Sequence, residues 1–276
     1  MCSINHNLKA IYIHIPKNAG LYVKKVLEKH YGFITFSLIH EDHDEFVDEY
    51  EPFHDPEIGW ISIRKKGMLN YYMSSKIHDK EMKITKAQWD SYFKFTFVRN
   101  PYEKVVSAWK FAMETDKLFK FPPVFSLLDF LKTKDTTTNY TYTHGFITQT
   151  DHLLNLEDKL DIQYIGKFED LNEELCNVLF KLGIKKITHY GMIKGNFVVN
   201  LRKGKKTSYD RYYNQEALEL ANELFKDDFA NFHYKKCETI EELQEDSKKY
   251  YCDEELFVEK NKLLLEKLQK EGKTIM

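Results

Sequence analysis

Cysteine is scarce in this sequence, and its spacing is irregular. The 276 residues include 4 cysteines, and no two of them form a CxxC pair. This spacing argues against a zinc site and against a disulfide framework. We therefore expect the chain to work in a reducing compartment.

An excess of positive charge is also missing. Lys and Arg number 41 against 43 Asp and Glu, so the formal net charge is -2. No global field therefore draws the chain to nucleic acid or to an anionic membrane, and any anion site must be local. Long apolar runs are absent as well, since no stretch has the length needed to cross a bilayer and the N-terminus has no signal-like segment. The sequence predicts no membrane insertion.

Core-forming side chains are abundant: 42% of the residues are hydrophobic, including 20 Phe and 18 Tyr, which is enough for one main domain. Short apolar runs predict strands at residues 10–15, 93–98 and 163–168. A helical pattern follows each of them, beginning near residues 21, 101 and 172. This alternation predicts an α/β fold with a central, mostly parallel sheet and helices on both faces.

The C-terminal part of the chain has a helical pattern. An amphipathic stretch covers residues 215–232, and the Glu- and Lys-rich residues 239–273 carry leucines spaced for one or two peripheral helices. We assign residues 1–236 to one domain and residues 237–276 to a helical extension packed on or beside it. The alternative for the leucine pattern is self-association into a homodimer.

Two strand-to-helix turns carry the functional argument, because loops at the carboxyl edge of a parallel sheet lead into helix N-termini that favour anions. In the first turn, Lys17 supplies a mobile charge, and Ala19 and Gly20 let backbone amides approach a phosphate. In the second turn, Arg99 offers a planar fork, and Ser107 lies two helical turns further on. The first loop does not read GxxxxGK[ST], which disfavours a magnesium-dependent kinase.

The segments IHIPKNAG (13–20) and FTFVRNPYEKVVSAW (95–109) resemble the two cofactor motifs of the sulfotransferases, especially the carbohydrate-type branch. QYIGKFEDL (163–171) and RYYNQEALELANELFKDDFANFHY (211–234) resemble later segments of that family. The resemblance implies a three-layer, P-loop-NTPase-like fold. It also implies that 3′-phosphoadenosine 5′-phosphosulfate (PAPS) is the donor, 3′,5′-bisphosphoadenosine (PAP) the product, and a hydroxyl of a carbohydrate or glycoconjugate the acceptor, with no metal.

The resemblance also assigns roles to residues by position. Lys17 acts on the reacting end of the donor, and Arg99 and Ser107 hold the 3′-phosphate. Where the family usually has Lys-Thr-Ala-Gly-Thr-Ser, this chain has Lys-Asn-Ala-Gly-Leu-Tyr, so the Asn18 amide and backbone amides replace two hydroxyl donors. The other expected cofactor contacts, from this loop and from a basic loop, are Asn18, Ala19, Gly20, Leu21, Tyr22, Arg202 and Lys206.

A base is needed to take the acceptor proton, and histidine has a suitable pKa. In the family the base usually falls between the two motifs, where this chain has five histidines: His30, His40, His43, His54 and His78. We favour His40 because SLIH (37–40) follows a further short stretch that reads as a strand, then His43, with Glu41 third. The alternative is a solvated histidine in an acidic loop, and the spacing of HEDHD (40–44) disfavours a metal site.

Several assignments stay open at this point. Gln149 either touches substrate or caps the structure, and Trp109 and Phe111 are expected in the core rather than stacked on adenine. A nucleotide kinase or hydrolase, and a nucleotide-binding homologue without catalysis, are the rival functions. Because animal relatives sit in the Golgi behind an anchor, we expect the cytoplasm of a microbe or virus if the chain is full length, or the Golgi lumen if an anchor was removed.

Overall fold

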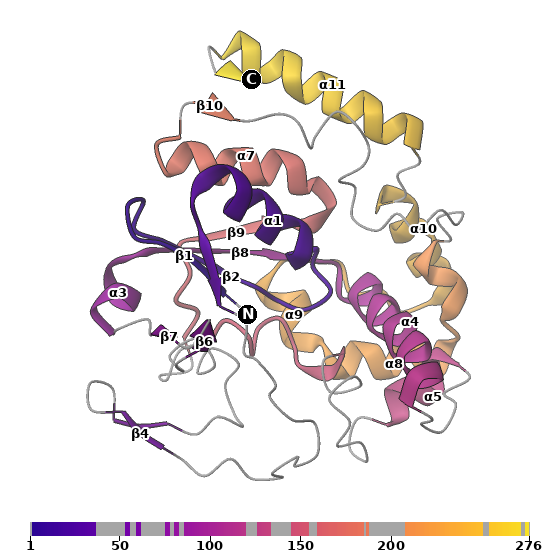
Figure 1. Cartoon of the computed structure of the whole chain (residues 1–276). Coiled ribbons are helices and arrows are strands. Elements are labelled where there is room, and N and C mark those ends of the chain that lie inside the picture. The colour runs from indigo at the N-terminus through magenta and orange to yellow at the C-terminus, as the bar shows by residue number, and fades with distance from the viewer. Residues whose placement is uncertain are drawn as a thin grey trace.

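A five-stranded sheet lies at the centre of the protein, with strand order β3-β1-β2-β8-β9 (Figure 1). Its strands are β1 (Cys2–Asn5), β2 (Ala10–Ile13), β3 (Ile34–Phe36), β8 (Phe93–Val98) and β9 (Tyr164–Lys167). This computed structural model describes residues 2–36, 53–55, 59–61, 75–77, 80–82, 86–119, 126–133, 145–154, 159–184, 186–187, 208–250, 254–271 and 274–275.

The three strands expected from the sequence are present and parallel to one another: β2 pairs with β8, and β8 with β9. The first of them ends at Ile13 rather than Ile15. Sequence analysis missed β1, which is antiparallel to both β2 and β3. Because β1 is antiparallel to both of its neighbours, β3 and β2 run in the same direction. Phe36 and Ile13 lie at the same height along the strands, because both pair with Cys2. The carboxyl ends of β2 and β3 therefore meet at one edge of the sheet.

A helix follows each parallel strand, as the sequence predicts. The first, α1 (Gly20–Tyr31), ends at Gly32, whose φ of 67° is the left-handed conformation that glycine adopts without strain. The second, α4 (Pro101–Phe119), begins after Asn100, whose side-chain oxygen accepts from the Tyr102 amide at 3.0 Å. The third is α7 (Leu171–Lys181).

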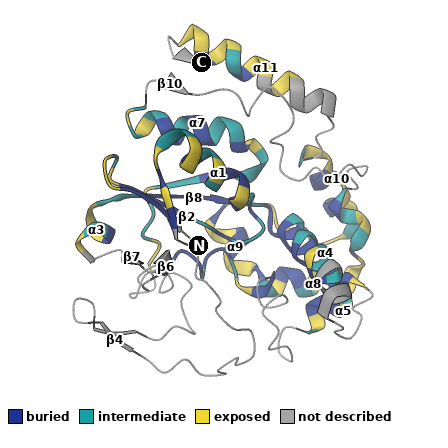
Figure 2. Ribbon diagram, in the orientation of Figure 1, coloured by how far each residue is buried: buried dark blue, intermediate teal, exposed yellow. Residues whose placement is uncertain are grey.

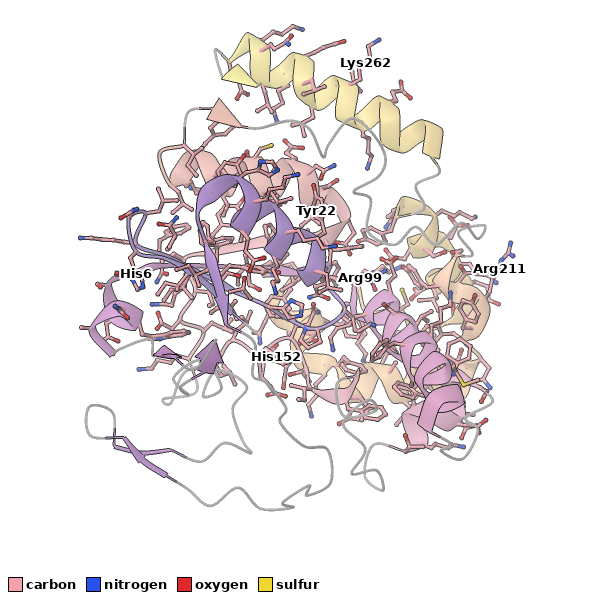
Figure 3. All side chains as sticks on the ribbon, in the orientation of Figure 1. His6, Tyr22, Arg99, His152, Arg211 and Lys262 are labelled. Carbon is pink, nitrogen blue, oxygen red and sulfur yellow. The ribbon has the colours of Figure 1, made fainter. Side chains whose placement is uncertain are left out.

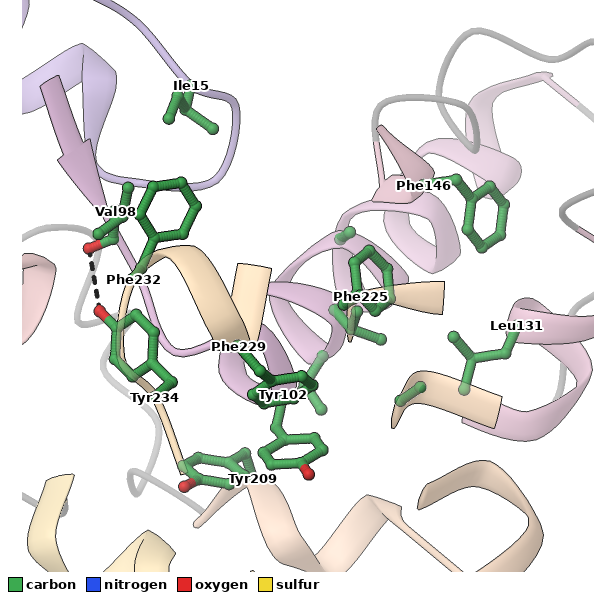
Figure 4. Packing of buried hydrophobic residues seen from close by; sticks show 14 of the residues in the cluster. Ile15, Val98, Tyr102, Leu131, Phe146, Tyr209, Phe225, Phe229, Phe232 and Tyr234 are labelled. Carbon is green, nitrogen blue, oxygen red and sulfur yellow. Dashed lines mark hydrogen bonds between the residues drawn. The ribbon is translucent and has the colours of Figure 1, made fainter. Parts of the chain in front are cut away.

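Helices cover both faces of the sheet, because successive strand residues point to opposite sides. Tyr12 and Phe95 pack in one cluster with side chains of α1 and α7. Ile11 and Ile13 belong to another cluster, with side chains of α4 and of α8 (Gln215–Leu224). Figure 2 shows the buried strands between these helices, and Figure 4 shows the second cluster, where Tyr102 packs against Phe229.

The C-terminal leucine pattern forms two helices, α10 (Ile240–Tyr250) and α11 (Glu254–Lys270), which bury Leu243 and Leu268 against the rest of the protein. Among the described residues, none of the helices combines the length and the apolar character needed to cross a membrane. The remaining elements are β4 (Phe53–Asp55), β5 (Gly59–Ile61), β6 (Ser75–Ile77), β7 (Lys80–Met82), α3 (Lys86–Ser91), α5 (Leu127–Lys132), η1 (Phe168–Asp170), β10 (Lys186–Ile187), η2 (Tyr209–Tyr212), α9 (Lys226–Asn231) and β11 (Thr274–Ile275).

Candidate functional site

The first turn, between β2 and α1, holds two non-glycine residues in the left-handed conformation: Lys17 with φ 70° and Ala19 with φ 60°. Each costs on the order of 1 kcal/mol, and such strain persists only where neighbouring contacts fix it. Asn18, between them, supplies those contacts. It is fully buried, and its side-chain nitrogen donates to the Phe97 carbonyl at 2.9 Å and to Gln149 Oε1 at 2.7 Å.

Two backbone amides of this turn are available to an anion. The Tyr22 amide donates to the Ala19 carbonyl at 2.9 Å, whereas the amides of Gly20 and Leu21 make no hydrogen bond within the described part of the chain. Free amides at the start of a 12-residue helix favour an anion. A Cβ on Gly20 would lie 1.6 Å from Nδ1 of His14, so glycine is required for this close packing.

The Asn18 side chain and the Tyr22 backbone amide, both expected to donate to the anion, are bonded inside the protein instead. Both hydrogens of the Asn18 amide are used inside the protein, so in this structure the group has no hydrogen left to donate to a phosphate. The Tyr22 ring is buried, and its hydroxyl donates to Asn172 on α7 at 3.1 Å. Leu21 is 63% exposed. The donors that this loop can present to an anion are the amides of Gly20 and Leu21 and the Lys17 ammonium.

The second turn lies directly against the first. The Arg99 guanidinium donates through Nη1 to the Lys17 carbonyl at 2.9 Å, and Nη2 is 2.7 Å from Glu103 Oε1. Its Cζ lies over the Phe168 ring, 4.3 Å from the ring centroid. Arg99 is labelled beside this turn in Figure 3, and only 12% of its side chain is exposed. The two predicted cofactor turns are thus joined by a hydrogen bond.

The Lys17 ammonium reaches the helix that follows the second turn. Its Nζ lies 4.0 Å from the centroid of the Phe111 ring on α4. Residues four apart share a helix face, so Ser107 and Phe111 lie on the same face of α4. Phe111 is 40% exposed, so its expected place in the core is wrong, whereas the partly buried Trp109 does pack in the core and contacts Tyr212. Lys17 and Arg99 therefore meet where the two turns join, and Ser107 lies on the face of α4 that the Lys17 ammonium reaches.

A carboxylate supports the second turn from behind. Glu169 accepts from the Asn100 amide at 2.7 Å and from the Tyr234 hydroxyl at 2.8 Å. The same hydroxyl lies 3.3 Å from the carbonyl of Val98, a bond drawn in Figure 4. Burial, with the nearby Glu103 charge adding to it, raises the pKa of Glu169 to about 7.

This raised pKa predicts a pH-dependent stability. Since the folded protein holds the Glu169 proton more tightly than the unfolded chain, the free energy of unfolding falls as pH rises from about 4.5 to about 7 and then levels off. A shift of this size corresponds to at most ~3 kcal/mol. Glu169→Gln should flatten that part of the profile measured by urea unfolding between pH 5 and pH 8. Glu241→Gln, at an exposed position, is the control. If the profile of Glu241→Gln is as flat as that of Glu169→Gln, the pH dependence does not come from Glu169.

Of the remaining candidates, one lies far from this site and most fall outside the described part of the chain. His30 lies on the last turn of α1, about 15 Å along the helix from its first residue, so it is too far from Lys17 to act as the base. The strand that precedes His40 does run toward the expected edge of the sheet. Four predicted site residues lie outside the described part of the chain: His40, His43, Arg202 and Lys206. Glu41 and His78 lie outside it as well.

Sequence analysis missed several residues that hold the two turns. Glu103 was recognisable as a carboxylate four residues after Arg99, on the same helix face. Phe168 and Glu169 were recognisable only as part of the segment QYIGKFEDL, without a role. Gln149 was noted, but nothing in the neighbouring sequence indicated that it contacts both turns.

Comparison with known proteins places these motifs in a family. The profile described as "Sulfotransferase family" matches residues 2–235. An uncharacterized protein of Archaeoglobus fulgidus is 33% identical over 103 residues, which cover 37% of this chain and 77% of the relative. No solved structure matches the chain significantly.

Proposed function

Because the chain belongs to the sulfotransferase family, we propose that it moves a sulfuryl group from PAPS to a hydroxyl of a carbohydrate or glycoconjugate. The proposal includes the carbohydrate-type branch and a three-layer, P-loop-NTPase-like fold. The observation that supports it best is the 2.9 Å hydrogen bond from the Arg99 guanidinium to the Lys17 carbonyl. A bisphosphorylated nucleotide carries negative charge at both ends, so its site needs two cationic positions that are no further apart than the length of the nucleotide.

In this proposal the first turn binds the reacting end of the donor. The donor supplies a sulfuryl group whose bond to the 5′-phosphate oxygen breaks as the acceptor oxygen bonds to sulfur, and the hydroxyl proton passes to a base. The amides of Gly20 and Leu21 bind the 5′-phosphate, and the Lys17 ammonium stabilises the negative charge that develops on the leaving oxygen. The two amides are fixed before the donor arrives, because Asn18 anchors the loop backbone.

The second turn binds the other end of the nucleotide. Arg99 and Ser107 hold the 3′-phosphate, and Arg202 and Lys206 close on it from the basic loop. His40, or else His43, takes the proton of the acceptor. The direction of β3 supports His40, since the end of that strand is level with the end of β2 and about 10 Å from it across two strand spacings.

The proposal is tested by donor binding and turnover. We expect PAP to raise the melting temperature and to bind in calorimetry equally well with magnesium or with EDTA. Purified protein should then transfer label from sulfur-labelled PAPS to a panel of glycans and glycolipids. Binding that requires magnesium, with release of phosphate from ATP, would favour the kinase or hydrolase instead.

One observation favours a second candidate, a nucleotide-binding homologue with impaired catalysis. The Asn18 amide and the Tyr22 hydroxyl both bond to other protein groups, so the first loop has no side-chain hydroxyl or amide left for the sulfuryl end. PAP binding without transfer to any acceptor, under conditions where the protein is folded, would identify this alternative.

A further inference from the structure

The site opens where β2 separates from β8. Their paired residues end at Tyr12 and Phe95, but β8 continues to Val98. Backbone groups beyond the last pair need new partners, because a buried unpaired carbonyl or amide is costly. Thr96 contributes one replacement contact, since its hydroxyl donates to the Ile13 carbonyl at 2.8 Å.

Side-chain amides supply the other partners. Asn18 donates to the Phe97 carbonyl, and Gln149 bonds both backbone groups of Arg99. Its Oε1 accepts from the Arg99 amide at 2.8 Å, and its Nε2 donates to the Arg99 carbonyl at 2.8 Å. A carboxamide presents a donor beside an acceptor, as a peptide group does. Gln149 therefore takes the place of one residue of a neighbouring strand, at a point where β2 no longer pairs with this part of the chain.

The same side chain also holds the first turn. Oε1 of Gln149 accepts from Asn18 at 2.7 Å in addition to the Arg99 amide, so one oxygen contacts both turns. All of Gln149 is buried, which removes water as a competitor for these bonds. One amide group therefore ties Asn18 directly to Arg99, in addition to the bonds from Arg99 to the Lys17 carbonyl and from Asn18 to the Phe97 carbonyl.

Gln149 is itself fixed from the other layer of the protein. Its backbone amide donates to Asp228 of α9 at 2.9 Å, and the next amide, of Thr150, donates to the same carboxylate at 2.8 Å. The buried Lys104 of α4 donates to the Ile147 carbonyl at 2.8 Å, which holds the segment on its other side. The segment around residue 149 is thus tied to two helices and to both turns.

We propose that Gln149 is a positioning residue for donor binding, which sets the separation of the first and second turns without touching the donor. This inference rests on the proposed function for its ligand. It explains why Asn18 has an amide where the family loop usually has a hydroxyl: the amide has the two hydrogens needed to reach Phe97 and Gln149 together.

The test replaces Gln149 by methionine, which is similar in length but forms none of these bonds. Calorimetry with PAP should show at least about a tenfold loss of affinity, since even one buried hydrogen bond can account for that factor. The KM for PAPS should rise by a similar factor while the KM for the acceptor stays unchanged, a separation that general destabilisation does not produce.

Asn222→Met is the matched control. The Asn222 amide is also buried, accepts from the Tyr102 hydroxyl and donates to the Cys237 carbonyl at 2.8 Å, but it contacts neither turn. This variant should lose comparable thermal stability and keep its PAP affinity within about twofold, a difference below the cost of a lost bond. Wild-type affinity in Gln149→Met, or an equal loss in Asn222→Met, would overturn the proposal.

Hydrogen exchange separates this inference from the proposed function. In Gln149→Met the Arg99 amide should exchange faster than in the wild type, whereas in Asn222→Met its exchange should be unchanged. If the wild type fails to bind PAP, the proposed function fails, and exchange at Arg99 still reports whether Gln149 fixes the turn. Unchanged exchange in Gln149→Met would refute the positioning role.

Discussion

Replacing Lys17 by alanine is expected to lower the turnover of PAPS by about 10²-fold or more while the fold stays intact. One preorganised group that stabilises developing charge is typically worth that factor. At rest the ammonium contacts the partly exposed Phe111 ring, whose centroid lies 4.0 Å away. A cation–π contact at an exposed site contributes about 0.5–1 kcal/mol, so a sulfuryl or phosphate oxygen can displace it.

The fold should survive because the structural bond of Lys17 uses its backbone. Arg99 donates to the Lys17 carbonyl, which alanine retains, and alanine already occupies the left-handed conformation two residues further on. Lys25→Ala, an exposed position on α1, is the control and should keep wild-type turnover. The measurement is single-turnover transfer from labelled PAPS. If Lys17→Ala transfers at the wild-type rate, Lys17 has no part in the reaction.

The sheet was predictable because its parallel strands are short, apolar and followed by clear helical patterns. Ala10–Ile13, Phe93–Val98 and Tyr164–Lys167 were expected nearly as found. The strand Cys2–Asn5 was missed because its four residues, CSIN, are too few for their alternation of apolar and polar side chains to stand out. Its place in the sheet is fixed by pairing with β2 and β3, which no local pattern reveals.

The candidate site was predictable at the level of its two turns. Lys17 and Arg99 follow parallel strands that are neighbours in the sheet, so their turns had to meet at one edge, and a hydrogen bond joins them. The conformation of the first turn was not predictable. Nothing in the letters KNAG shows that Lys17 and Ala19 are left-handed or that Asn18 points inward.

Long-range partners were beyond sequence reasoning for a physical reason. Gln149 contacts Asn18, which is 131 residues away, and Glu169 contacts Asn100, which is 69 residues away. Such bonds depend on how the layers pack rather than on periodicity or propensity. Only the contact of Arg99 with Glu103 follows a local rule, because residues four apart share a helix face.

Replacing Arg99 by alanine is expected to weaken PAP binding by about 10- to 100-fold, because hydrogen bonds to a charged group contribute about 1.5–3 kcal/mol. The loss has two sources. The 3′-phosphate loses its planar fork, and the first turn loses the 2.9 Å bond to the Lys17 carbonyl. Arg99→Lys keeps the charge without the fork, so its affinity should lie between those of the wild type and Arg99→Ala.

Two further variants show whether the phosphate is the partner of Arg99. Ser107→Ala removes a single neutral hydrogen bond, so calorimetry should show only about a two- to tenfold loss. Glu103→Gln removes the carboxylate that lies 2.7 Å from Nη2 and repels the phosphate, so its affinity for PAP should equal or exceed that of the wild type. Since Arg99→Ala also breaks the tie to the first turn, it should lose more affinity than Ser107→Ala. If instead Arg99→Ala binds PAP as tightly as the wild type, the 3′-phosphate binds at some other turn.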